Sequence, residues 1–171
     1  MRLFIGIQFD GEIKDELLEV QDELKKKLKG NFTRSENLHL TLVFLGEYDR
    51  KMQYQACLAM NDIKASCFKV RLNRLGRFGK EDGLIWIDMM PQDGLLNLYK
   101  AVCTVLDERN HPYDKKAFKP HITLARRCGS LPDSVSARGA AQQSVSKVSL
   151  MLSERKNGKI IYSEIYSVSL K

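Results

Sequence analysis

Hydrophobic and polar residues follow two different spacings along the chain, which divide it into short elements. Apolar runs of a length typical of buried strands occupy residues 3–9, 38–45 and 84–90, and each is bounded by Gly, Pro or Asp. A more basic strand is predicted over residues 68–78, where the sequence reads FKVRLNRLGRF. The chain is therefore expected to be rich in β-structure.

Apolar residues spaced three and four apart predict amphipathic helices between these strands. The first helix is expected to stop at Gly30, and its apolar positions are Ile13, Leu17, Val20, Leu24 and Leu28. A second helix is expected over about residues 49–65. A third fades near Asn110, and its apolar positions are Leu95, Leu98, Val102 and Val105.

The order of strand, helix and strand occurs twice at a nearly constant offset. The first strands begin at residues 3 and 84, which are 81 positions apart, and the helices begin near residues 12 and 93. An internal repeat of this kind predicts two pseudo-symmetric lobes.

The C-terminal part of the chain lies outside the repeat. Residues 147–170 are expected to form a β-hairpin that turns at Asn157-Gly158, a dipeptide typical of tight hairpin turns. Residues 128–146 are expected to form a loop followed by a weak helix.

Length and composition favour a single domain spanning residues 1–171, with two small lobes that share an interface. No apolar run approaches the roughly 20 residues that cross a bilayer, and the first residues do not resemble a secretory signal. We therefore expect a cytoplasmic protein with no membrane segment. The four cysteines form no C-x-x-C pair, so reduced thiols are expected.

The formal net charge is +7, which favours a polyanionic partner such as RNA because Lys and Arg release counterions from phosphates. Charge alone is weak evidence. Part of the excess lies on a predicted helix surface, in the KKKLK sequence of residues 25–29.

Two of the three histidines interrupt apolar runs, and each is followed by a threonine two residues later. The sequences are HLTL at residues 39–42 and HITL at residues 121–124, and the histidines are 82 positions apart, from 39 to 121. Residues i and i+2 of a strand share a face, so each strand presents an imidazole beside a hydroxyl and buries its aliphatic side chains on the other face. One such pair is usually structural, but two at matching points of a repeat indicate a functional site.

Paired imidazoles suit phosphoester cleavage. With ordinary pKa values near 6.5, one histidine can accept a proton while the other donates one. The threonines could hold the phosphate oxygens, and a nearby cation could stabilise the transition state. No Asp, Glu or Cys accompanies either motif, so we expect no metal. The residues alone do not tell the proton donor from the acceptor.

These motifs resemble those of a known family. Paired H-x-T-x sequences half a chain apart are similar to the signature motifs of the two-histidine (2H) phosphoesterases. Together with RLFIGIQF at residues 2–9, ENLHLTLVFLGE at 36–47 and FKPHITLAR at 118–126, they resemble the RNA 2′,3′-cyclic phosphodiesterases, also called 2′-5′ RNA ligases or LigT-type proteins. The resemblance extends from residue 2 to about residue 127.

The resemblance implies an α+β fold in which two lobes line a central cleft with antiparallel β-sheets and carry helices outside. It implies that His39 donates a proton to the departing 3′ oxygen, that His121 accepts a proton from the attacking water, and that Thr41 and Thr123 bind the phosphate. The implied reaction needs no metal or nucleotide cofactor and yields an RNA 2′-phosphomonoester, with 2′-5′ ligation as its reverse. The implied partners are RNA ends with a 2′,3′-cyclic phosphate or 2′-phosphate, tRNA fragments among them, and we expect a monomer.

An arginine five residues after the second histidine also belongs to the family pattern, and Arg126 occupies that position. In a regular strand, however, Arg127 rather than Arg126 would share the face of His121. Either the strand ends or bulges after Leu124, which would turn Arg126 inward, or Arg127 takes its role. We expect Arg126.

Other candidates carry weaker signals. Phe9, at the end of the first strand, could stack on a base, and Trp86 lies on the matching strand of the repeat. Arg74 and Arg77 could form a basic rim, and His111 is expected in a surface loop. The alternative functions are a 2H phosphoesterase acting on small cyclic nucleotides and a non-catalytic RNA-binding module.

Overall fold

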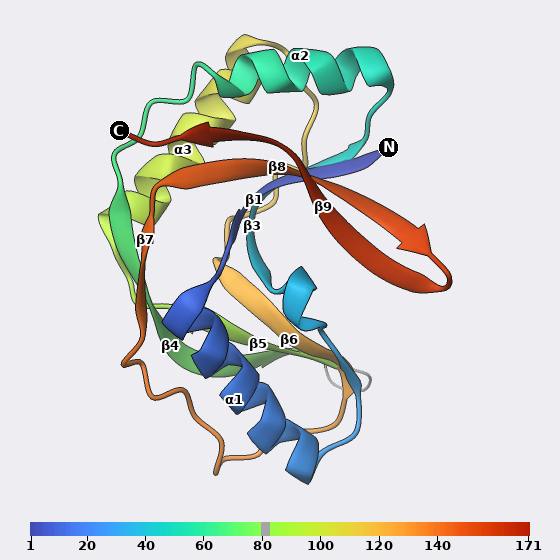
Figure 1. Cartoon of the computed structure of the whole chain (residues 1–171), viewed down its shortest axis with the longest axis vertical. Coiled ribbons are helices and arrows are strands. Elements are labelled where there is room, and N and C mark those ends of the chain that lie inside the picture. The colour runs from blue at the N-terminus through green and yellow to red at the C-terminus, as the bar shows by residue number, and fades with distance from the viewer. Residues whose placement is uncertain (80–82) are drawn as a thin grey trace.

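The computed structural model describes residues 1–79 and 83–171, in which three α-helices accompany an antiparallel sheet (Figure 1). The helices are α1 (Gly11–Lys27), α2 (Arg50–Met60) and α3 (Asp93–Glu108), and a short 3₁₀-helix covers Ser35–Asn37. The strands are β1 (Arg2–Gln8), β2 (Asn31–Phe32), β3 (His39–Glu47), β4 (Phe68–Phe78), β5 (Gly83–Met89), β6 (His121–Cys128), β7 (Gln142–Val145), β8 (Lys147–Lys156) and β9 (Lys159–Ser169).

The strand order is β7-β4-β5-β6-β3-β1-β8-β9, with β2 paired to β6. The sequence repeat maps onto the two halves of this order, because β1 and β3 correspond to β5 and β6. The halves meet where β3 and β6 pair in antiparallel fashion at Leu40 and Ile122. The predicted fold of two pseudo-symmetric lobes is thus confirmed, and the strands that carry the His-x-Thr motifs lie side by side at the seam.

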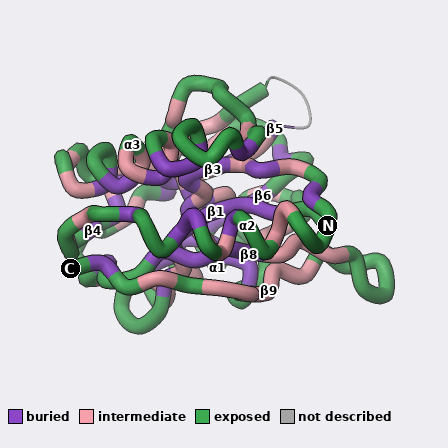
Figure 2. Tube along the Cα trace, turned by 90° about the horizontal axis from the view of Figure 1, so that it is seen from above, coloured by how far each residue is buried: buried purple, intermediate pink, exposed green. Residues whose placement is uncertain are grey.

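Two of the helices pack on strands of the half to which their preceding strand does not belong. α1 follows β1 in the chain but packs against β6 and β7, and α3, which follows β5, packs against both β3 and β4. Figure 1 shows α1 beside the lobe of β4, β5 and β6, with α2 and α3 at the opposite end of the molecule. One hydrophobic cluster includes buried residues of both halves, and Figure 2 shows buried positions along the central strands and exposed ones on the outer helix surfaces. The helices and the shared hydrophobic core therefore hold the two halves together.

Most predicted elements are present, but two predictions were wrong. The second helix ends at Met60, because the amides of Asn61, Asp62 and Ile63 make turn-like bonds to carbonyls three residues back. The weak helix expected before residue 146 is instead β7, which adds to the free edge of β4 and buries Val145. Edge pairing thus overrides the weak local preference of this polar segment.

The C-terminal hairpin forms as predicted. Asn157 and Gly158 have φ values of 50° and 76°, the left-handed conformation that a two-residue hairpin turn requires. Of the helices in the described part of the chain, none has the length and apolar character that crossing a membrane requires.

Candidate active site

The two His-x-Thr motifs line one cavity of about 460 Å³ at the seam between the lobes. His39, Thr41, His121 and Thr123 all contribute to its wall, together with Arg126. Their placement follows from strand alternation: Leu40, Leu42, Ile122 and Leu124 are at most 4% exposed and anchor the opposite face in the core. Side chains about 80 positions apart in sequence thus converge on one space.

Each imidazole is oriented by a backbone carbonyl two residues earlier in the chain. His39 Nδ1 lies 2.7 Å from the oxygen of Asn37, and His121 Nδ1 lies 2.6 Å from the oxygen of Lys119. A carbonyl oxygen can only accept, so Nδ1 carries the proton in both rings and donates it. The neutral tautomer therefore leaves each Nε2 as a proton acceptor, and that of His39 lies 3.0 Å from the hydroxyl of Thr41.

The electrostatic environment of His39 disfavours its charged form. Burial lowers the pKa of His39 most, the hydrogen bond to Asn37 opposes this, and the nearby charges of His121 and Arg126 lower the pKa further. Three groups that can carry positive charge therefore act on one another in the cavity. A bound anion would offset this repulsion, so the site is suited to a phosphate group.

Aromatic rings frame both histidines. Phe4 and Tyr162 lie with ring centroids 4.7 and 4.8 Å from His39. Phe78 and Trp86 lie 5.4 and 6.4 Å from His121. These rings fix the orientation of the imidazoles, as a preorganised acid–base site requires.

A β-bulge brings Arg126 to the cavity. The register between β5 and β6 passes from Trp86–Thr123 to Ile85–Ala125, so Leu124 is an extra residue in its strand. The bulge changes the alternation, and Arg126 lines the cavity whereas Arg127, with a φ of 54°, is not part of its wall. Of the alternatives that the sequence left open, the structure has the bulge; contact of Arg126 with a phosphate stays a prediction.

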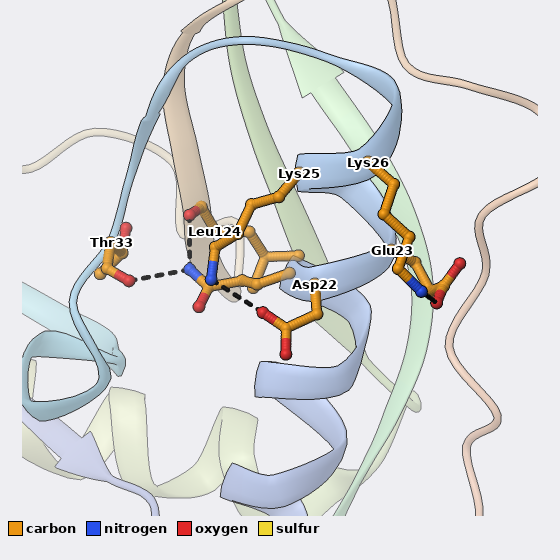
Figure 3. Close-up of polar contacts among 7 residues, drawn as sticks. Asp22, Glu23, Lys25, Lys26, Thr33 and Leu124 are labelled. Atoms are coloured by element: carbon orange, nitrogen blue, oxygen red, sulfur yellow. Dashed lines mark hydrogen bonds and ion pairs between the residues drawn. The ribbon is translucent and has the colours of Figure 1, made fainter.

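The carbonyl group of Leu124, the extra residue of the bulge, accepts hydrogen bonds from α1 and from the segment before the first His-x-Thr motif. The oxygen of Leu124 accepts one hydrogen bond of 2.8 Å from the backbone amide of Thr33 and another of 2.8 Å from Nε2 of Gln21. The same Nε2 also donates to the oxygen of Thr33 at 2.8 Å (Figure 3). Gln21 is only 1% exposed. The neighbouring ion pairs in Figure 3, Lys25–Asp22 and Lys26–Glu23, are exposed and join residues within α1.

Sequence reasoning missed this support, although a signal was present. Gln21 lies four residues after Leu17 and three before Leu24, on the apolar stripe of the predicted helix. A polar side chain in that position must find buried partners, since an unsatisfied one is costly.

Several other candidates lie outside the cavity. Phe9, expected as a stacking surface, is 5% exposed and belongs to the hydrophobic core, where its ring cannot receive a base. The rings that do line the cavity are Phe4, Phe44 and Tyr162. Trp86, on β5, is not part of the cavity wall although its ring lies 6.4 Å from that of His121, and its indole nitrogen is buried without a hydrogen-bond partner among the described residues.

The predicted basic rim and surface histidine are also placed by the structure. Arg74 pairs with Asp88 at 3.1 Å, and Arg77 donates to the oxygen of Gly129 at 3.0 Å. The expectation for His111 was wrong: it is 8% exposed and stacks on Tyr48 at 5.9 Å, because the loop after α3 packs against Tyr48, whose hydroxyl donates to the oxygen of Pro112 at 2.8 Å. It takes no part in the cavity.

The four cysteines, Cys57, Cys67, Cys103 and Cys128, are free thiols, as expected. Within residues 1–79 and 83–171, no group of three or more His, Cys, Asp or Glu side chains is placed to hold a metal ion.

Two pseudo-symmetric lobes, with a His-x-Thr motif on each of the adjoining central strands, define the class of the two-histidine phosphoesterases. A family model described as the 2′-5′ RNA ligase superfamily matches residues 12–154. The chain belongs to this superfamily, and the resemblance seen in the motifs is confirmed.

Curated relatives agree with this assignment, and solved structures share the fold. The chain is 30% identical over 133 residues to the RNA 2′,3′-cyclic phosphodiesterase of Thermotoga maritima, covering 74% of this chain and 70% of that protein. It is 29% identical over 181 aligned positions to that of Thermus thermophilus, covering 100% and 91% of the two chains. The crystal structure of Escherichia coli LigT in its apo form superimposes with a TM-score of 0.87 at 24% identity, covering 99% and 96%. A structure from Thermus thermophilus gives 0.85 at 26%, covering 99% and 97%.

Proposed function

We propose that this protein hydrolyses the 2′,3′-cyclic phosphodiester ends of RNA to 2′-phosphomonoesters without a metal. The observation that carries the proposal is the convergence of both His-x-Thr motifs and Arg126 on a single cavity. The names of the relatives support the choice of RNA 2′,3′-cyclic ends as the substrate. The protein is a phosphoric diester hydrolase of the cell interior that acts on RNA fragments, tRNA halves among them.

In the proposed reaction His121 accepts a proton from water as the water oxygen attacks phosphorus. The bond between phosphorus and the 3′ oxygen breaks, and His39 gives that oxygen a proton. The Nδ1 bonds to Asn37 and Lys119 support these roles, because they fix both rings and leave both Nε2 atoms for proton transfer. The choice of His39 as donor follows the family.

His39 must be protonated to act as the donor. Burial and the charges of His121 and Arg126 lower its pKa in the empty site, so the bound phosphate has to supply the opposing negative charge. Thr41, Thr123 and Arg126 are proposed to hold the phosphate oxygens, with Arg126 stabilising the charge that develops in the transition state.

The direct test offers a defined oligonucleotide with a 2′,3′-cyclic phosphate and identifies the monoester by mass spectrometry and chromatography. A 2′-phosphate as the sole product, formed at the same rate with and without EDTA, supports the proposal. A 3′-phosphate, or loss of activity on chelation that added metal restores, contradicts it.

A small cyclic nucleotide is the second candidate substrate. The volume of the cavity, about 460 Å³, falls in the range of small-molecule sites, so one nucleotide could fill it without a longer strand. Comparing kcat/KM for a cyclic mononucleotide with that for an oligonucleotide separates the two candidates, and salt-sensitive RNA binding with no turnover of either would instead indicate a binding module.

A further inference from the structure

A second hollow opens from the candidate active site on the side of His121. It has a volume of about 270 Å³ and shares Thr41, Phe44 and His121 with the main cavity. Its other wall consists of Phe78, at the end of β4, and the loop before β6. The two hollows therefore adjoin one another at these three residues, which places the second hollow beside the reacting groups.

Phe78 gives this hollow an aromatic surface. The ring is 37% exposed, although it is held against Trp86 at 5.0 Å and meets His121 edge-on at 5.4 Å and 89°. Exposed aromatic rings beside basic side chains are a common means of binding single-stranded nucleic acid, because every base can stack on them.

The charged groups of the hollow favour an anion near this ring. The ammonium of Lys119 lies 5.9 Å from the centre of the Phe78 ring. Lys116 and Asp114 also line the hollow and pair with each other at 2.9 Å, so they contribute little net charge. Among the residues that the structure describes, no carboxylate lies within ion-pair distance of Lys119. A phosphate can therefore reach it.

We propose that Phe78 and Lys119 form a subsite for a second nucleotide, the one that carries a 5′-hydroxyl. The inference rests on the proposed function. If His121 handles the proton of the attacking group, a 5′-hydroxyl that replaces water must approach from the side of His121, and Phe78 and Lys119 lie on that side. The base stacks on Phe78, and the 3′-phosphate of the same nucleotide contacts Lys119.

The subsite supports a balanced transesterification. The 5′ oxygen bonds to phosphorus as its proton passes to His121, the bond to the 3′ oxygen breaks, and His39 protonates that oxygen. The product is a 2′-5′ phosphodiester. In the reverse direction the 3′-hydroxyl gives its proton to His39, and the 5′ oxygen leaves with a proton from His121.

The test compares three substrates that share the same adenosine in the main cavity. Adenosine 2′,3′-cyclic phosphate needs only water. A 2′-5′-linked adenylyl-adenosine with a 3′-phosphate also fills the proposed subsite. A 3′-5′-linked adenylyl-adenosine with a terminal 2′,3′-cyclic phosphate extends in the upstream direction instead. The variants are Phe78→Leu, which keeps apolar packing on His121 but removes the aromatic face, and Lys119→Gln, which keeps the backbone carbonyl that orients His121.

We expect Phe78→Leu to lower kcat/KM for the 2′-5′ substrate about tenfold relative to the cyclic mononucleotide. Lys119→Gln should lower the same ratio by less, and its effect should shrink at high salt because a surface charge pair is screened. Tyr54→Leu and Lys51→Gln change an exposed aromatic residue and an exposed lysine of α2, away from the cavity, and should leave all three rates unchanged.

Three outcomes would overturn the subsite. The first is an equal decrease in kcat/KM for the 2′-5′ substrate and the cyclic mononucleotide in the variants. The second is a decrease in kcat/KM for the upstream dinucleotide alone. The third is a wild-type protein that hydrolyses the cyclic phosphate but does not cleave the 2′-5′ substrate. If the wild type turns over no cyclic phosphate at all, the proposed function fails together with the subsite.

Discussion

The two halves of the candidate active site repeat one another in backbone but differ in the side chain that each bulge turns toward the cavity. The register between β1 and β3 passes from Gly6–Thr41 to Ile5–Val43, so Leu42 is an extra residue just as Leu124 is in β6. Both bulges turn the residue two positions later toward the cavity. That residue is Arg126 in the half of His121 and Phe44, 82 positions earlier, in the half of His39.

The difference shows how a duplicated frame can carry out an asymmetric reaction. The same carbonyl bond, threonine and ring pair surround both imidazoles, so the frame alone would make them equivalent. Burial of His39 and the nearby Arg126 of the opposite half lower the pKa of His39, because burial and a nearby cation both disfavour a charged imidazole. The donor role proposed for His39 therefore depends on the negative charge of a bound phosphate, which offsets these effects.

Removal of either imidazole should have the largest effect. His39→Ala and His121→Ala should each lower kcat on an RNA 2′,3′-cyclic phosphate by about 10² to 10⁴, since each takes away one acid–base group. Steady-state kinetics with matched circular dichroism spectra measure this. His111→Asn changes the third histidine, which lies outside the cavity, and should lower the melting temperature rather than kcat. Near-normal turnover in either alanine variant would contradict the pairing.

The asymmetry at the bulges can be tested with adjacent arginines. Arg126→Ala should lower kcat/KM about tenfold or more, because a charge-assisted hydrogen bond to the phosphate contributes about 1.5–3 kcal/mol. Arg127→Ala is the matched control and should retain most of the activity, since Arg127 is not part of the cavity wall. The reverse order of effects would show that Arg127 is the phosphate ligand.

The pKa of His39 should respond to the charges around it. In the free protein it lies below 6.5, mainly through burial, so NMR titration of the imidazole should show protonation only at lower pH. Inorganic phosphate should raise this pKa because a bound anion favours the imidazolium, and Arg126→Ala should also raise it by removing a cation. A pKa that phosphate leaves unchanged would indicate that the anion binds elsewhere.

The smallest expected effect concerns the hydrogen bonds from Gln21 that stabilise the bulge at Leu124. Gln21→Met keeps the length of the side chain but removes the hydrogen bonds to Leu124 and Thr33. We expect the free energy of unfolding to fall by about 1–3 kcal/mol, because the buried carbonyl of Leu124 and the partly buried carbonyl of Thr33 each lose a donor. Thermal or urea unfolding measures the change, with Gln55→Met on the exposed face of α2 as the control. Equal stability of the two variants would show that water replaces the amide.

The sequence was sufficient for elements and motifs whose signals are local. Apolar periodicity predicted β1, α1, β3 and α3, and the repeated His-x-Thr motif indicated which strands meet at the site. It was not sufficient where contacts with residues far away in the sequence determine the local structure. β7 forms because β4 offers a free edge, and Phe9 is buried in a hydrophobic core to which all parts of the chain contribute.

The site shows the same limit at single residues. Strand parity alone favoured Arg127 over Arg126, and the bulge that reverses this order depends on the pairing of β6 with β5 and on Gln21, 103 residues from Leu124. Long-range hydrogen bonds of this kind leave no local signal other than a polar residue on an apolar stripe.

The packing of α1 on the opposite half of the sheet has a consequence for assembly. Because α1 covers strands made from the last third of the chain, a ribosome must deliver nearly the whole polypeptide before the first helix can dock. Early intermediates would expose the apolar stripe of α1, and splitting the chain between α2 and β4 would give two fragments that need each other to become ordered. The two lobes are therefore related by pseudo-symmetry, but they are not independent folding units.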